Sequence, residues 1–235
     1  MPDALKTSKY VVAFIDVLGA KGMIKKDVDG SLNIVHRAYQ RSIDFFEQHF
    51  TKTPFAVHIF SDNIIIGCRV PNNELLLRCF RAVNIMAAMV QGNFLFNGLL
   101  VRGGIAYGDF YKDDIMVWGS ALVKAYELES TMAFYPRVII DPDLVGDLNL
   151  LLEEDKIKES KLWLRADNDG LLYVDYLQEK YIKDYNMVLL SELSAYDRRT
   201  IECEVEPKIM QKNIWQLNYV KSKLFGGNSD ASNEG

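Results

Sequence analysis

The sequence has few of the residues from which many familiar sites are built. Its three cysteines are scattered, with no CxxC pair, so a zinc site and a disulfide framework are both disfavoured. Only three histidines occur, and no GxSxG motif is present, which leaves little basis for Ser-His-Asp chemistry. The motifs GxxxxGK[ST] and GxGxxG are also missing, so P-loop and dinucleotide-binding folds have no support.

Basic charge is scarce as well. The net charge is −5, and the lysines and arginines form no cluster, which argues against a nucleic-acid partner. The N-terminal segment "MPDALKTSKY" lacks the apolar core of a signal peptide, and we expect no apolar stretch long enough to cross a membrane. The expected location is the cytoplasm, where thiols stay reduced.

The sequence has enough apolar residues for one packed core, and strand patterns alternate with helix patterns along it. Hydrophobic residues make up 49% of the chain. Strand patterns are expected at 10–19, as two strands around "SDN" within 55–70, at 98–110, at 136–141, and as a hairpin turning at "DNDG" within 161–177. Helices are expected from Ser31 as a cap to about residue 49, from Pro71 for about twenty residues, over 120–132, and from Pro142.

This order predicts an α+β fold with a ferredoxin-like βαββαβ core, in which helices pack over a mixed or antiparallel sheet. We expect residues 1–178 to form the main domain. Residues 179–225 are expected to be a helical extension packed on that domain, and residues 226–235 a disordered tail.

Asp16 most needs a chemical explanation. It interrupts the apolar run "AFIDVLGA", and a carboxylate buried in a strand must be paired or bound. Asp62 lies at the tip of the 55–70 hairpin, where it is also a good turn residue. In a βαββαβ sheet this hairpin neighbours the first strand, so the two carboxylates could meet at one edge. They would repel each other unless a cation joined them, and Mg²⁺ and Mn²⁺ favour carboxylate and phosphate oxygens.

Other residues could extend such a site. Gly19 permits a tight turn and close approach of a ligand, and the successive amides of 18–21 could cradle a phosphate, although a plain strand-to-loop glycine is the alternative. Arg102, on the 98–110 strand, could pair with a buried acid or reach a ligand. His58 precedes Asp62 by four residues, but a lone strand histidine is more often structural.

Four segments, taken in order along the chain, resemble the catalytic domain of class III nucleotidyl cyclases, the adenylate and guanylate cyclase fold. "FIDVLG" resembles the family's F-x-D-[IV]-x-G strand, and "HIFSDNIII" resembles its hairpin with the second metal-binding aspartate. "VRGGIAYG" resembles its R-x-G-I-x-x-G strand, and "VWGSALVKAYELES" its D-x-W-G-x-x-V-N-x-A-x-R-M-E helix segment. The similarity covers about residues 10–141, and the combination is more specific than any single segment.

The resemblance implies cyclisation of a nucleoside triphosphate by two Mn²⁺ or Mg²⁺ ions, at sites formed between the subunits of a homodimer. Asp16, Asp62 and the carbonyl of Val17 would hold the ions. The ribose 3′ oxygen would attack the α-phosphate and release pyrophosphate. The implied catalytic residues are Asp16, Asp62 and Arg102. The implied substrate contacts are Val17, Leu18, Gly19, Ala20, Lys21, His58, Phe60 and Arg102.

The sequence departs from the family pattern at four positions. His58 stands where the family has its purine-reading lysine, and Met116 where it has the partner aspartate. Val123 replaces the ribose-positioning asparagine, and Glu127 replaces the transition-state arginine. A cation would then have to come from elsewhere, and Arg102 is the candidate substitute.

These departures resemble one branch, the pyrimidine cyclases of bacterial Pycsar antiphage systems, which make cyclic UMP or cyclic CMP for a separate effector protein. UTP is the favoured substrate, with CTP as the alternative, because His58 and Arg102 could both donate to uracil carbonyls. One competing hypothesis is a degenerate cyclase fold that only binds a nucleotide. The other, ranked last, is a palm-like polymerase or a diguanylate cyclase. A diguanylate cyclase would have a GG[DE][EF] motif in its hairpin, and this sequence has "FSDN" there instead.

Overall fold

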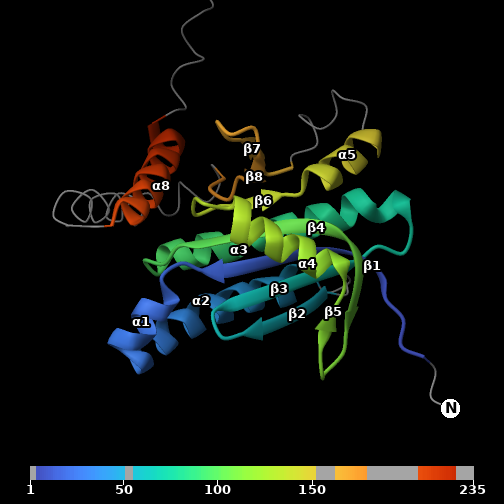
Figure 1. The fold of residues 1–235 in the computed structure, drawn as a ribbon, viewed down its shortest axis with the longest axis horizontal. Coiled ribbons are helices and arrows are strands. Elements are labelled where there is room, and N and C mark those ends of the chain that lie inside the picture. The colour runs from blue at the N-terminus through green and yellow to red at the C-terminus, as the bar shows by residue number, and fades with distance from the viewer. Residues whose placement is uncertain (1–3, 51–54, 152–161, 179–205, 226–235) are drawn as a thin grey trace, which may run out of the picture. The chain divides into compact units, whose positions relative to one another are not determined.

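The structure is a computed structural model that describes residues 4–50, 55–151, 162–178 and 206–225 (Figure 1). The chain divides into two compact units, Met1–Tyr176 and Leu177–Gly235. The elements are β1 (Ser8–Val17), α1 (Ala20–Lys26), α2 (Val28–His49), β2 (Phe55–Phe60), β3 (Asn63–Arg69), the 3₁₀ turn η1 (Asn73–Leu75), α3 (Leu76–Phe96), β4 (Val101–Lys112), β5 (Val117–Trp118), α4 (Ser120–Glu127), the π-helical segment η2 (Leu128–Met132), β6 (Val138–Ile140), α5 (Pro142–Leu151), β7 (Leu164–Ala166), β8 (Leu172–Val174) and α8 (Pro207–Phe225).

The sheet of the first unit has the strand order β2-β3-β1-β4-β6-β8-β7, and β5 pairs with β4 beside this path. β1 runs antiparallel to both of its neighbours, whereas β4 and β6 run parallel. The first four strands therefore have the order 2-3-1-4 of a split βαβ arrangement, in which each helix crossover skips one strand. The predicted α+β class, with a mixed sheet and a ferredoxin-like core, is confirmed.

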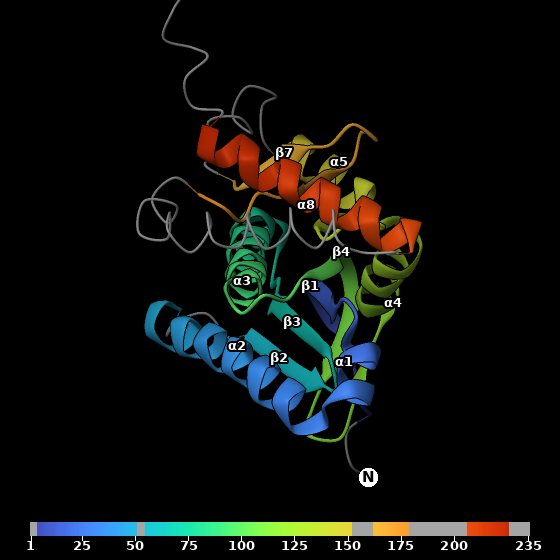
Figure 2. The ribbon, with the colours of Figure 1, turned by 90° about the vertical axis from the view of Figure 1, so that its left-hand side faces the viewer.

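The two faces of this sheet carry different helices. Figure 2 shows α2 and α3 on one side of the sheet and α4 on the other. Along β1 the side chains alternate between these faces. Val11, Ala13 and Ile15 are buried on the α3 side, while Val12 packs with Ala121 of α4. Both faces of the central strand are thus covered over most of its length, which explains its continuous apolar sequence.

α3 is a core helix. By length and composition, the stretch Asn73–Phe96 could span a membrane, so our expectation that no stretch is long enough was wrong. However, 61% of its apolar window is buried within the fold, and Phe80, Val83 and Met86 are fully buried. Packing against the sheet therefore accounts for its apolar composition.

The segment after β1 differs from the prediction. The sequence predicted that the helix after this strand begins with a cap at Ser31, but the chain forms the short helix α1 and then begins α2 at Val28. Asp27 is the N-cap of α2, and its carboxylate accepts a hydrogen bond of 2.9 Å from the Gly30 amide. The Asp27 carboxylate thus satisfies one of the free amides of the first turn, a role that we had given to Ser31.

The expected C-terminal helical region is described only in part. α8 starts at Pro207, and within its unit the Tyr219 hydroxyl accepts a hydrogen bond of 3.0 Å from the Leu177 amide. The expected helical segment 179–205 and the expected disordered tail 226–235 lie outside the described residues.

The β7–β8 hairpin contains more than a plain turn. The guanidinium of Arg137 is fully buried and forms ion pairs with Asp167 and Asp169, both in the "DNDG" turn. It also lies over the rings of Tyr135 and Tyr173. Burial alone would raise the pKa of Asp169, but hydrogen bonds from Arg137 and the Leu171 amide outweigh that effect and lower it. The turn thus supplies the charges that allow an arginine into the core.

We predict that the double variant D167N/D169N loses about 3–5 kcal/mol of unfolding free energy, because it removes the two carboxylates of the turn that pair with the buried guanidinium. Urea denaturation monitored by circular dichroism measures this loss. The matched control D147N changes an exposed aspartate and should stay within about 0.5 kcal/mol of the wild type. Equal stability of the double variant and the control would contradict the structural role of the turn.

Candidate functional site

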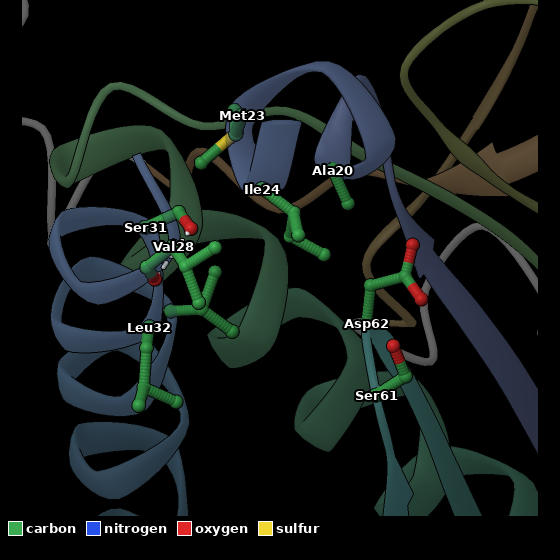
Figure 3. A pocket seen from close by; sticks show the side chains of 9 residues that line it. Ala20, Met23, Ile24, Val28, Ser31, Leu32, Ser61 and Asp62 are labelled. Atoms are coloured by element: carbon green, nitrogen blue, oxygen red, sulfur yellow. Dashed lines mark hydrogen bonds between the residues drawn. The ribbon is translucent and has the colours of Figure 1, made fainter. Parts of the chain in front are cut away.

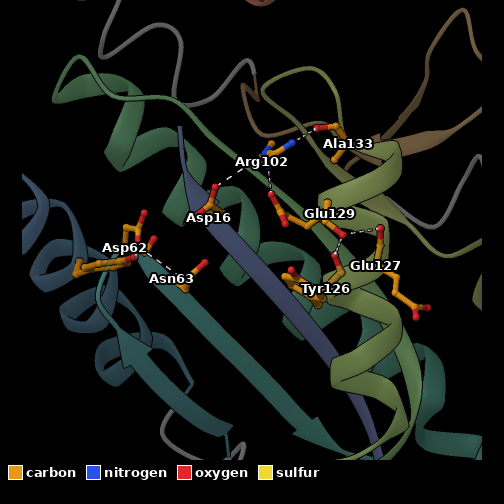
Figure 4. A network of polar contacts seen from close by, with 10 residues as sticks. Asp16, Asp62, Asn63, Arg102, Tyr126, Glu127, Glu129 and Ala133 are labelled. Carbon is orange, nitrogen blue, oxygen red and sulfur yellow. Dashed lines mark hydrogen bonds and ion pairs between the residues drawn. The ribbon is translucent and has the colours of Figure 1, made fainter. Parts of the chain in front are cut away.

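Four side chains form one row across the first four strands. The strand registers place Phe60 opposite Asn63, Asn63 opposite Asp16, and Asp16 opposite Arg102. Residues directly opposite each other in antiparallel strands project to the same face, here the face that α4 covers in part. Figure 4 shows Asp16 between the hairpin that carries Asn63 and the arginine on β4.

The backbone ties Asp62 to the end of β1. The carbonyl of Asp62 accepts a hydrogen bond of 3.2 Å from the Val17 amide and one of 3.1 Å from the Tyr39 hydroxyl. Asp62 also directly precedes Asn63, the register partner of Asp16. The structure therefore brings the two aspartates of the sequence hypothesis to the same edge of the sheet, meaning the border where β1 ends and the β2–β3 hairpin turns.

The negative charges of Asp62 and Asp16 both act on the hydroxyl group of Tyr39. Burial raises the pKa of its phenol, and the negative charges of Asp62 and then Asp16 raise it further. Both carboxylates therefore lie within electrostatic reach of one hydroxyl group.

The turn that holds Asp62 is strained. Ser61 has a φ of 55°, the one positive φ of a non-glycine residue in the described part of the chain. A left-handed backbone costs a non-glycine residue about 1–2 kcal/mol. Strain of this kind persists where the surrounding structure enforces it, and it is common at functional sites.

Asp16 is less buried than the sequence suggested. Its side chain is 23% exposed because it is the penultimate residue of β1, and the Nε atom of Arg102 lies 3.9 Å from its Oδ2 atom. The arginine offsets part of the charge, and solvent access leaves the carboxylate open to a further ligand. Arg102 is thus a partner of Asp16, one of the two roles that its position on the strand allowed.

Sequence reasoning missed Glu129, the most buried acid at this site. Its side chain is 4% exposed, and its Oε1 atom lies 2.6 Å from Nη2 of Arg102. Arg102 Nη1 also donates to the carbonyl of Ala133, at 3.5 Å. The available signal was the last glutamate of "VWGSALVKAYELES", which matches the final letter of the cyclase-like motif.

Gly104 explains how Glu129 reaches Arg102. A Cβ atom at Gly104 would lie 2.5 Å from the carbonyl oxygen of Ala125, a distance that no real side chain tolerates. A residue without a side chain lets the C-terminal end of α4 rest directly on β4. The following segment η2 then carries Glu129 to Arg102, two residues before Gly104 on the same face.

The loop after β1 differs in part from a phosphate cradle. The amide of Leu18 donates to the carbonyl of Leu100 at 2.8 Å, so our prediction that this amide binds a phosphate was wrong. Gly19 has a φ of 81° and caps α1, which begins at Ala20. The first amides of a helix have no partner within it, so Ala20 and the exposed Lys21 keep the potential to bind an anion.

The predicted base-reading pair does not converge within one chain. His58 lies opposite Ile65, so it belongs to the next row of cross-strand partners on this face and not to the row that contains Asp16. Its strand, β2, is separated from β4 by β3 and β1. Strands are spaced about 4.8 Å apart, which places the two backbones about 14 Å apart. Arg102 is moreover held on the far side by Glu129. Phe60 lies near the turn, with 72% of its side chain exposed.

A cavity of about 210 Å³ adjoins Asp62 (Figure 3). It lies between α1, α2 and the hairpin turn, and apart from Asp62 and two serines its lining is apolar. Such a lining does not suit a triphosphate, so phosphates would bind at its rim. The lining residues are Ala20, Met23, Ile24, Val28, Ser31, Leu32, Val35, Ser61 and Asp62.

The donor set at the edge suits a hard cation only with help from a ligand. Within the described ranges, no group of three or more histidine, cysteine, aspartate or glutamate side chains could hold a metal ion. Two carboxylates and a backbone carbonyl are the oxygen donors that Mg²⁺ and Mn²⁺ prefer, and these ions commonly complete their shells with phosphate oxygens and water. The pair of aspartates therefore fits an ion that arrives with a nucleotide.

Of the four positions that depart from the family pattern, three are exposed and His58 is half-buried. Met116 precedes β5, and Val123 and Glu127 lie on the outer side of α4. None of the three contributes to the charged row around Asp16.

No protein-family model matches the chain, and no curated protein matches it in sequence. Among solved structures, the guanylyl cyclase Cya2 is similar, with 8% identity and a TM-score of 0.43 over 72% of this chain and 93% of that chain. A bacterial light-regulated adenylyl cyclase has 12% identity and a TM-score of 0.47 over 80% of this chain and 100% of its own. A class III adenylyl cyclase-like ATP-binding protein from Pseudomonas aeruginosa has 9% identity and a TM-score of 0.47 over 63% of this chain and 37% of its own. These values are too low to carry an argument, so function is argued from the site.

We predict that Tyr39→Phe lowers the unfolding free energy by about 1 kcal/mol, the usual net value of a buried hydrogen bond, because the carbonyl of Asp62 loses a donor. Urea denaturation measures the change. Tyr126→Phe, at a half-exposed tyrosine on α4, is the matched control and should be neutral. A Tyr39→Phe protein as stable as the wild type would show that this bond does not anchor the hairpin.

Proposed function

We propose that this chain is a metal-dependent nucleotide cyclase of the class III type. It would convert a pyrimidine nucleoside triphosphate, with UTP favoured over CTP, to the 3′,5′-cyclic monophosphate and pyrophosphate. The observation that carries the proposal is the placement of Asp16 and Asp62 at one sheet edge, joined through the bond from the Val17 amide to the Asp62 carbonyl. The resemblance of four ordered segments to the cyclase family supports the same reading.

In this mechanism Asp16, Asp62 and the carbonyl of Val17 would hold the divalent ions. When bound, Mn²⁺ or Mg²⁺ would neutralise phosphate charge and favour the deprotonated 3′ oxygen. The chain's own part would be to orient the triphosphate with the first amides of α1, from Ala20, and with the exposed Lys21. The 3′ oxygen then forms a bond to the α-phosphorus, and the bond from that phosphorus to the bridging oxygen breaks.

Two further parts of the proposal rest on the resemblance alone. The preference for pyrimidines is supported by the loss of the purine-reading pair, at His58 and Met116. The role as a signal in antiphage defence, through a separate effector that binds the product, is supported by the similarity to the Pycsar branch.

We predict that the purified protein with Mn²⁺ makes cyclic UMP from UTP, detected by mass spectrometry, and that D16N and D62N lose at least about 100-fold in rate. Outer-shell changes at metal sites already cost about 10–100-fold, and these variants remove direct ligands. D147N, at an exposed aspartate, is the control. No cyclic product from UTP, CTP, ATP or GTP would refute the proposal, and product from a purine nucleotide alone would refute the base preference.

The second candidate is a module that binds a nucleotide without turnover. The observation that favours it is the replacement of the family's asparagine and arginine by Val123 and Glu127 on α4. This candidate requires that nucleotides raise the melting temperature while every product assay stays blank. The retained pair of aspartates favours the enzyme, because a pure binder has no need of two adjacent metal-binding carboxylates.

A homodimer is also part of the proposal. Several large apolar residues are more than half exposed in the first unit, and a second subunit could cover them. Those near the α4 face or on the β4–β5 hairpin are Phe60, Ile115, Trp118, Val123 and Tyr126.

We predict that Trp118→Glu dissociates this dimer, because it places a charge among apolar side chains that the partner would cover. Sedimentation should then give the mass of one chain instead of two, and cyclisation should fall with it. The matched control Leu5→Glu adds the same charge at an exposed apolar position that precedes β1. A wild-type protein that sediments as a monomer at all concentrations would contradict the prediction.

A further inference from the structure

The guanidinium of Arg102 lies between two carboxylates of unequal burial. Its Nη2 atom is 2.6 Å from Glu129, whose side chain is 4% exposed, and its Nε atom is 3.9 Å from Asp16, which is 23% exposed. Figure 4 shows the arginine reaching from β4 toward both acids. Arg102 therefore has two acidic partners. The close one, Glu129, lies away from the sheet edge that carries the aspartates, and the more distant one, Asp16, lies at that edge.

We propose that Glu129 is a positioning residue that sets the affinity of Asp16 for a divalent cation. By holding Arg102, Glu129 keeps the guanidinium from closing on Asp16 and competing with the ion. The inference rests on the metal-binding part of the proposed function and goes beyond it, because Glu129 has no assigned role there.

The geometry explains why Glu129 holds the arginine more strongly. The two ion pairs differ in length, 2.6 Å for Glu129 and 3.9 Å for Asp16, and the shorter one belongs to the more buried acid. Attraction between charges falls with distance and is screened less when the pair is buried. Arg102 therefore stays with Glu129, and Asp16 keeps an open side toward the solvent.

Neutralising Glu129 should weaken cation binding in two ways. In Glu129→Gln, the guanidinium is left with Asp16 as the charged partner that faces it, so an incoming ion must displace it. The variant also removes a negative charge from behind the site. Both effects have the same sign, so the affinity for the ion should fall.

Removing the arginine as well should reverse the effect. In the double variant R102M/E129Q, no guanidinium competes with the ion for the carboxylate of Asp16. Arg102→Met alone is a poorer test, because it leaves Glu129 as a buried charge without its cation and so threatens folding. The double variant replaces a buried ion pair by neutral groups of similar size, which proteins often tolerate.

The experiment is a titration of the full chain with Mn²⁺ alone, with free Mn²⁺ followed by electron paramagnetic resonance and folding checked by circular dichroism. We expect Glu129→Gln to bind Mn²⁺ about 10-fold more weakly than the wild type, as for other outer-shell changes. We expect R102M/E129Q to bind at least as tightly as the wild type. The control Glu127→Gln, the same change at an exposed position two residues earlier, should have no effect.

Because breaking a buried pair also destabilises the fold, Mn²⁺ affinities are compared only at temperatures where circular dichroism shows every variant fully folded, and there a purely structural role for Glu129 predicts no loss of affinity. The inference is overturned if Glu129→Gln binds Mn²⁺ like the wild type, if the double variant binds as weakly as the single one, or if the wild type shows no binding that D16N abolishes. Failure of the proposed function is separate: a protein that shows the predicted Mn²⁺ pattern but makes no cyclic nucleotide refutes the cyclase and leaves the role of Glu129 standing.

Discussion

The register of β1 between its two antiparallel neighbours is the constraint on which the rest of the site depends. Side chains alternate along a strand, so a slip by one residue would turn Asp16 to the α3 side and an apolar neighbour to the α4 side. The buried residues Val11, Ala13 and Ile15 make that slip costly, because they fit the α3 side. The hydrophobic core therefore determines where the carboxylate lies, without any contact that involves the carboxylate itself.

The same edge of the sheet gathers features that do not favour stability. Two like charges lie near each other, and Ser61 has a left-handed backbone in the turn beside them. The hydrogen bonds from Val17 and Tyr39 to the carbonyl of Asp62 hold this arrangement in place. Strain that is maintained by surrounding structure is a common property of binding and catalytic sites.

Much of this arrangement could be predicted from the sequence, because local patterns determine it. The alternation of strands and helices predicted the split βαβ order, and that order alone predicted that Asp16 and Asp62 meet. What depends on contacts between distant segments could not be predicted in the same way. The amide of Leu18 is taken by Leu100, and Glu129 is buried only because Gly104 lets α4 approach β4.

The position of Glu129 also bears on the sequence hypothesis that Arg102 replaces the family's transition-state arginine. To reach a substrate, the guanidinium would have to leave a carboxylate that is almost fully buried. Breaking such a pair costs about 3–5 kcal/mol, because it leaves a buried charge uncompensated. That cost would offset the benefit that one well-placed hydrogen-bond donor brings to a transition state, about 3–4 kcal/mol. If the chain is the cyclase proposed above, the charge that develops in the reaction must therefore be stabilised by the bound ions or by a group from the second subunit, while Arg102 remains with Glu129.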